Sequence, residues 1–117
     1  MPIPSSREAP VSDHVFYELA IEVDPSSEQD WLDWYRRVHV LDVLRQPGFA
    51  RATFYHVETN SDEWARYIVS YEVESREALE AYFRGETVQR LRADHYTRFG
   101  GVTRASRQVR SLSFTVE

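Results

Sequence analysis

The chain has 117 residues, 42% of them hydrophobic and 14% aromatic, which is enough for one domain with one core. A formal net charge of −5 and the lack of any stripe of Lys and Arg argue against nucleic-acid binding. There is no cysteine and no apolar run long enough to span a membrane, which excludes disulfides and cysteine-ligated metals and leads us to expect a cytoplasmic protein without membrane contact.

The first 13 residues are rich in Pro and Ser and lack the apolar core of a signal peptide. We expect residues 1–13 to form a flexible N-terminal tail that is dispensable for folding. A single domain should then occupy residues 14–117.

Residues 14–23 alternate between apolar and mixed positions, which predicts a strand. A helix is predicted from about residue 28, capped by Ser27, to about Gln46, where Pro47-Gly48 ends it. Two more strands are predicted over residues 50–58 and 64–73, joined by a hairpin loop.

Ser75 is placed to cap a further helix, and Gly85 predicts a break before a second helical piece over residues 86–99. A last extended segment runs over residues 102–116. The order β-α-β-β-α-β predicts an α+β, ferredoxin-like fold, with one antiparallel sheet and helices on one face.

The other face of this sheet is predicted to carry large apolar groups among charged ones, more than a solvated face usually shows. We expect it to be the contact between two copies in a homodimer. Its predicted apolar members are Phe16, Ala20, Phe54, Trp64 and Ile68.

Two ionisable residues of the first helix, His39 and Asp42, fall within its apolar arc on a helical wheel. They are three positions apart, so their side chains can meet, and a carboxylate would raise the pKa of the imidazole and fix its tautomer. That arrangement suits a general base. The alternative is a partly buried histidine bonded to the backbone, with Asp42 at the rim.

His95 lies on an apolar stripe of the last helix, where burial should keep it neutral, as a ligand contact or a packed core ring. Tyrosines are predicted on the facing surfaces of the sheet and the helices, as either a hydrogen-bonded core or a cavity with polar tips. They are Tyr17, Tyr35, Tyr55, Tyr67, Tyr71 and Tyr82. No cofactor motif and no metal-ligand spacing is present, so we expect neither a cofactor nor a metal.

The segments "YELAIEVD", "W..WYRRVHVLDVL", "PGFARATFY", "YIVSYEVESREALEAYF" and "LRADHYTRFGG" resemble a family of small bacterial proteins of unassigned function in the dimeric α+β barrel superfamily. That superfamily includes muconolactone isomerase, olivetolic acid cyclase, antibiotic-biosynthesis monooxygenases and haem-degrading monooxygenases. The resemblance implies a small-molecule pocket between sheet and helices, with His39 or His95 and a tyrosine such as Tyr71 transferring protons. The Asn, Trp and His set of the haem-degrading members is not evident here.

These observations favour a cofactor-free isomerase, cyclase or lyase that moves a proton on a carbonyl or polyketide-like substrate. His39 would be the base, Asp42 would orient it, and His95 or Tyr71 would assist. Tyr17, Tyr35, Tyr55, Tyr67 and Tyr82 would contact the substrate. The alternatives are a non-catalytic small-molecule binding module and a cofactor-independent monooxygenase.

Overall fold

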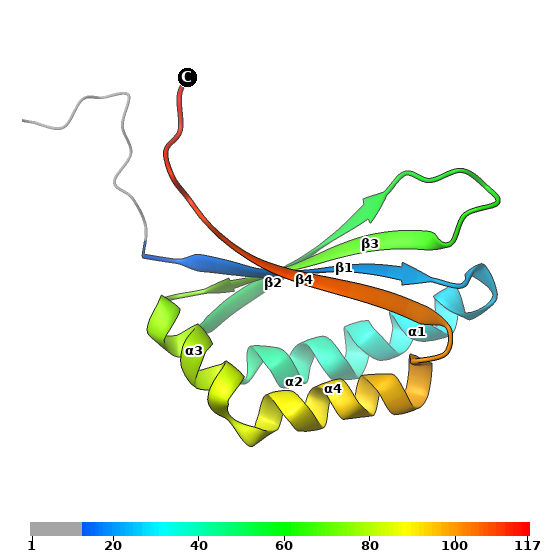
Figure 1. Cartoon of the computed structure of the whole chain (residues 1–117), viewed down its shortest axis with the longest axis horizontal. Helices are drawn as coiled ribbons and strands as arrows, with labels where there is room; N and C mark the ends of the chain where they lie inside the picture. Colours follow the sequence, from blue (N-terminus) through cyan, green and yellow to red (C-terminus); the bar gives the residue numbers. More distant parts are fainter. Residues whose placement is uncertain (1–12) are drawn as a thin grey trace, which may run out of the picture.

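The computed structural model describes residues 13–117, so the predicted tail, apart from Asp13, lies outside the described residues. Four antiparallel strands form one sheet in the order β2-β3-β1-β4, and all the helices cover one face of it (Figure 1). The elements are β1 Val15–Val23, α1 Glu28–Trp34, α2 Val40–Leu44, β2 Phe49–Val57, β3 Ala65–Val73, α3 Arg76–Arg84, α4 Glu86–Phe99 and β4 Thr103–Ser111. The predicted ferredoxin-like fold is therefore confirmed. Within residues 13–117, no helix is long and apolar enough to cross a membrane.

The first helical region begins after a short 3₁₀ turn, Pro25–Ser27. Asp24 caps this turn, because its carboxylate accepts a hydrogen bond from the Ser26 backbone N–H at 3.0 Å. Ser27 makes no side-chain cap bond, so the predicted capping role of Ser27 is wrong. The Pro25 ring has no N–H to donate and is compatible with this first turn.

A π-helical turn, Tyr35–His39, joins α1 to α2. One extra residue enters the helix there, so every later side chain rotates relative to a regular 3.6-residue helix. Val38 and Leu41, which a regular helix would place in its apolar arc, are 43% and 44% exposed. His39, Val40 and Val43 are buried in their place. The helical wheel was therefore wrong for Val38 and Leu41, while its inward placement of His39 is confirmed.

A β-bulge at the start of β2 changes which of its side chains face the helices. Phe49 is opposite Val73 and Arg51 is opposite Glu72, so Ala50 is the extra residue. After the bulge, Phe54 shares a face with the buried Val69, and its ring packs edge-on against the core ring of Tyr35, with centroids 5.5 Å apart. The placement of Phe54 on the open face was therefore wrong.

The two later helices follow their predicted signals. The Ser75 hydroxyl accepts a hydrogen bond from the Ala78 backbone N–H at 3.1 Å, which caps α3. Gly85 has an extended backbone and separates α3 from α4, as predicted. Together with α1 and α2, these helices cover a core of Trp31, Tyr35 and the inward residues of β1 and β3.

Gly48 ends the first helical region in the left-handed conformation, with a φ of 83°. A Cβ at this position would lie 2.6 Å from the Cβ of Ala78 in α3. We expect Gly48→Ala to lower the free energy of unfolding by roughly 2–3 kcal/mol, from backbone strain and the clash together. Gly101→Ala is the control, because nothing lies within 4 Å of its added Cβ. Chemical denaturation of both variants checks this, and equal losses would contradict it.

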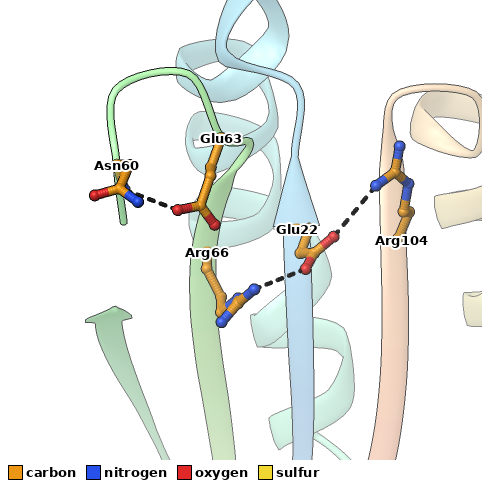
Figure 2. Close-up of polar contacts among 5 residues, drawn as sticks. All are labelled: Glu22, Asn60, Glu63, Arg66 and Arg104. Atoms are coloured by element: carbon orange, nitrogen blue, oxygen red, sulfur yellow. Dashed lines mark hydrogen bonds and ion pairs between the residues drawn. The ribbon is translucent and has the colours of Figure 1, made fainter. Parts of the chain in front are cut away.

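The open face of the sheet is covered with paired charges. Glu22 of β1 accepts from Arg66 of β3 at 3.0 Å and lies 3.6 Å from Arg104 of β4 (Figure 2). Asn60 and Glu63 close the neighbouring hairpin loop through a backbone N–H to carboxylate bond of 3.1 Å (Figure 2). This end of the open face is therefore already organised by interactions within one chain.

Glu18 forms a second charged group on the open face and is only 6% exposed. Its carboxylate accepts hydrogen bonds from Ser70 at 2.8 Å, Gln108 at 2.9 Å and Arg110 at 2.7 Å. Burial raises the pKa of Glu18, but these bonds outweigh that effect and lower the pKa below its usual value. Glu18 is thus a satisfied buried anion between three strands.

Candidate functional site

A cavity lies between the helices and the inner face of the sheet. Its volume is about 30 Å³, room for roughly two water molecules. The polar side chains that line it are Tyr17, Tyr35, Tyr71, Tyr82, His39, His95, Arg92 and Arg107. Leucine, isoleucine, valine and alanine side chains complete the wall. Most of the predicted site residues thus meet around one space, on the π-helical turn, α3, α4 and strands β1 and β3.

His39 closes the π-helical turn and points its ring into an aromatic cluster. Its ring centroid lies 4.7 Å from that of Tyr35, 5.1 Å from Trp34 and 5.8 Å from His95. Nδ1 of His39 is buried and finds no hydrogen-bond partner among residues 13–117. Burial, and next the neighbouring His95, lower the pKa of His39 to about 4. His39 is therefore a neutral imidazole at pH 7 with an unengaged ring nitrogen.

Asp42 does not orient His39. Its carboxylate accepts from Arg45 at 2.6 Å, and its side chain is 35% exposed. The predicted His39–Asp42 pair is wrong because the π-helical turn rotates Asp42 toward solvent. The negative charge of Asp42 raises the pKa of His39 only slightly against the larger effect of burial.

His95 has a fixed ring orientation. Its Nε2 accepts a hydrogen bond at 3.0 Å from Nε1 of Trp31, which can only donate. A neutral His95 must then carry its proton on Nδ1. Burial, and next the charge of Arg107, lower the pKa of His95. His95 is therefore suited to donating a hydrogen bond from Nδ1 and not to accepting a proton at Nε2.

Two tyrosines form a buried hydroxyl pair at the cavity. The oxygens of Tyr35 and Tyr71 are 3.1 Å apart. Burial raises the pKa of each well above the usual value, so both stay protonated. Burial also raises the pKa of Tyr82 to about 12. These phenols can donate hydrogen bonds to a ligand but cannot act as bases near pH 7.

Two of the predicted substrate-contacting tyrosines do not line the cavity. Tyr55 is 52% exposed, because the bulge in β2 turns it to the open face. Tyr67 of β3 is buried, and its hydroxyl donates to Glu28 at the start of α1. Burial and that bond raise the pKa of Tyr67 to about 12. Neither Tyr55 nor Tyr67 therefore lines this cavity.

Sequence reasoning missed two arginines of the cavity. Arg92 lies on the face of α4 that carries Val88, Leu91 and His95, at the spacing i, i+3, i+4 and i+7. Arg107 is opposite Leu19 on the helix-facing side of β4. The helical spacing could have identified Arg92, since its position belongs to an otherwise apolar stripe.

The low pKa of His39 makes stability depend on pH. Between pH 6.5 and about 4 the unfolded chain binds a proton at His39 that the folded chain excludes. The contribution of His39 to stability should be complete above pH 6.5 and fall by roughly 3 kcal/mol as the pH drops to 4. Chemical denaturation across this range should show that the free energy of unfolding of the wild type falls relative to that of His39→Phe as the pH drops, because phenylalanine does not bind a proton. A pH-independent difference would contradict the burial of a neutral His39.

Neither a metal nor a haem fits the cavity as it stands. No group of three or more ligand-type side chains that could hold a metal occurs within residues 13–117. A haem would need a wide slot beside its axial ligand. The cavity volume of about 30 Å³ is far too small for one. The chemistry of this site is therefore derived from its own side chains.

Three solved structures are similar to the chain across most of their length. A variant of SnoaB, a cofactor-independent oxygenase from Streptomyces nogalater, is 18% identical, with 89% of this chain and 97% of that chain covered and a TM-score of 0.62. An ethyl tert-butyl ether D (EthD) family protein from Bacillus halodurans is 12% identical, with 84% and 98% covered and a TM-score of 0.63. The haem degrader MhuD from Mycobacterium tuberculosis, with two haems bound in its active site, is 26% identical, with 88% and 99% covered and a TM-score of 0.58.

No curated protein matches the sequence. A family model does match, over residues 14–111, and its description is a domain of unknown function, DUF4286. The match spans all four strands and all the helices. The predicted resemblance to a family of unassigned function with the dimeric α+β barrel fold is confirmed, and the chain belongs to the DUF4286 family.

Proposed function

We propose that this protein is a cofactor-independent monooxygenase that oxidises a small, electron-rich carbon acid in the His39 cavity. The observation that carries the proposal is the neutral His39, which lines an aromatic cavity and whose buried Nδ1 has no hydrogen-bond partner among residues 13–117. The similarity to a cofactor-independent oxygenase supports it, and favours it over the isomerase, cyclase or lyase predicted first.

His39 would take the first proton. The substrate is a CH₂ group next to a carbonyl or an aromatic ring, whose carbanion is stabilised as an enolate. Nδ1 of His39 accepts the proton, and the enolate forming beside it stabilises the imidazolium that burial alone disfavours. Arg92 and Arg107 in the cavity wall add positive charge that favours the enolate.

Oxygen then reacts with the enolate directly. The enolate passes one electron to O₂, and the resulting radical and superoxide combine into a carbon–oxygen bond. Protonation gives a hydroperoxide, which loses water and leaves a carbonyl. The sum is CH₂ + O₂ → C=O + H₂O, so the substrate supplies every electron. Tyr35, Tyr71 and His95 would hold the carbonyl oxygen through donated hydrogen bonds.

A ring-sized substrate needs more room than the cavity offers at rest. Arg107 is exposed and lies on β4, an edge strand of the sheet. Movement of this one side chain enlarges the cavity without disturbing the buried core. The entrance is therefore expected along β4.

An oxygen electrode tests the proposal with a panel of anthrones and 1,3-diketones, which carry the required CH₂ group. We expect uptake of one O₂ per substrate with no added reductant or metal. Proton exchange or ring closure without oxygen uptake would favour the isomerase, cyclase or lyase function. Saturable binding of a panel member without turnover would identify a binding module.

The cytoplasmic location of the protein and the dispensability of its N-terminal tail for folding stay predictions.

We also propose that the open face pairs two copies of the chain. Phe16, Ala20 and Ile68 lie on that face, and residues 112–117 leave the sheet on the side opposite the helices (Figure 1). Leu112, Phe114 and Val116 in this segment are 40%, 73% and 77% exposed. Such alternating exposed apolar groups suit a partner chain.

Sedimentation at micromolar concentration should give twice the mass of the chain. Ile68→Asp should shift the protein toward monomer, because it places a charge at the centre of the open face. Val38→Asp is the control, since Val38 is exposed on the helix layer. A monomeric wild type at high concentration would contradict the dimer.

A further inference from the structure

The charge of the cavity is opposite to the charge of the chain. The protein carries a net charge of −5, yet the cavity lining holds two arginines, two histidines and no carboxylate. Acidic side chains sit elsewhere: Glu18 and Glu22 are paired on the open face, and Asp42 and Asp94 pair with arginines on the helix surface. Among its described lining residues, the cavity therefore has two guanidinium groups and no carboxylate to balance them.

The guanidinium group of Arg92 has a hydrogen-bond donor without a partner in this wall. Its Nε is buried without a hydrogen-bond partner among residues 13–117, and its one side-chain bond, to the Tyr17 hydroxyl, is 3.3 Å long. Arg107 forms no ion pair within the same range, and its charge lowers the pKa of both His39 and His95. A buried guanidinium donor without a partner costs free energy until something accepts from it.

We propose that the ligand of this cavity is an aromatic carboxylate, whose carboxylate is bound by Arg92 and Arg107 and whose ring is enclosed by the tyrosines. A guanidinium matches a carboxylate with two parallel hydrogen bonds, which makes arginine the preferred partner for this group. The rings of Tyr17 and Tyr71, which both line the cavity, have centroids 6.0 Å apart and planes at 24° to each other. This inference rests on the proposed function in one respect: it assigns a ligand to the same cavity. It does not require that the ligand be oxidised.

Binding measurements separate this inference from oxygen chemistry. Calorimetric titrations would use benzoate, salicylate and 1-naphthoate, each beside its neutral amide. At least one carboxylate should bind roughly 10-fold or more tightly than its amide, because a charge-assisted bond replaces a neutral one. The affinity should weaken as salt is raised.

Arg92→Gln and Arg107→Gln should each weaken carboxylate binding roughly 10-fold and leave amide binding unchanged. Arg90→Gln is the matched control, because Arg90 is exposed on α4 and does not line the cavity. Equal affinity for acid and amide, equal binding by all three variants, or no carboxylate binding up to millimolar concentration would overturn the inference. Carboxylate binding without oxygen uptake would uphold it while removing the monooxygenase.

Discussion

The His39→Ala variant should lose roughly 100-fold or more of the wild-type rate of oxygen uptake. Removing a positioned general base typically costs 10²–10⁴ in rate, and His39 has the unengaged nitrogen that the proton transfer requires. Its fold should survive. His39 loses no hydrogen bond from Nδ1 when truncated, and part of its ring borders empty space, so the expected loss in stability is about 1–2 kcal/mol.

Two further variants make this result interpretable. His39→Phe keeps a ring against Trp34 and Tyr35 but has no nitrogen, so it should be as inactive as the alanine variant and more stable. His56→Ala, at an exposed position of β2, should keep wild-type rates. Activity retained in His39→Phe would show that packing, and not proton transfer, is what His39 provides.

Trp31→Ala should be the most destabilising of the substitutions considered. Trp31 is fully buried, and its ring centroid lies 5.0 Å from Tyr35 and 5.4 Å from Tyr67. Truncation of a buried tryptophan typically costs 3–5 kcal/mol, which is a large share of the stability of a small domain. Tyr96→Ala is the control, because Tyr96 is 75% exposed and should cost less than about 0.5 kcal/mol. Urea denaturation measures both, and similar losses would contradict the assigned core.

Trp31→Phe separates packing from hydrogen bonding at the same position. It keeps an aromatic ring but leaves Nε2 of His95 without its donor. The tautomer of His95, read by ¹⁵N NMR, should then no longer be held with its proton on Nδ1. An unchanged tautomer would mean that another group fixes the ring of His95.

The fold followed from local patterns. Alternation in β1 and β3, the Ser75 cap and the break at Gly85 each reflect interactions between residues close in sequence, and the structure confirms them. Antiparallel pairing in the order β2-β3-β1-β4 then follows from the arrangement of strands and helices along the chain.

The errors arose where one extra residue changes the phase of a pattern. The π-helical turn at residues 35–39 moved Asp42 away from His39, and the bulge near Ala50 exchanged Tyr55 for Phe54 on the inner face. Both features are set by packing between distant elements, and a periodicity analysis assumes that neither occurs. Arg107 could not be identified from alternation alone, because an edge strand carries polar residues on both faces.

Isotope labelling tests the central claim, that the His39 cavity oxidises its substrate with O₂ itself. A substrate found with the oxygen electrode would be turned over under ¹⁸O₂ in ordinary water, and the product would be analysed at once by mass spectrometry. We expect one ¹⁸O atom in each product molecule from the wild type, and roughly 100-fold less labelled product from His39→Ala in the same time. Unlabelled product from the wild type, two labelled oxygens, or equal labelling by the variant would contradict the account.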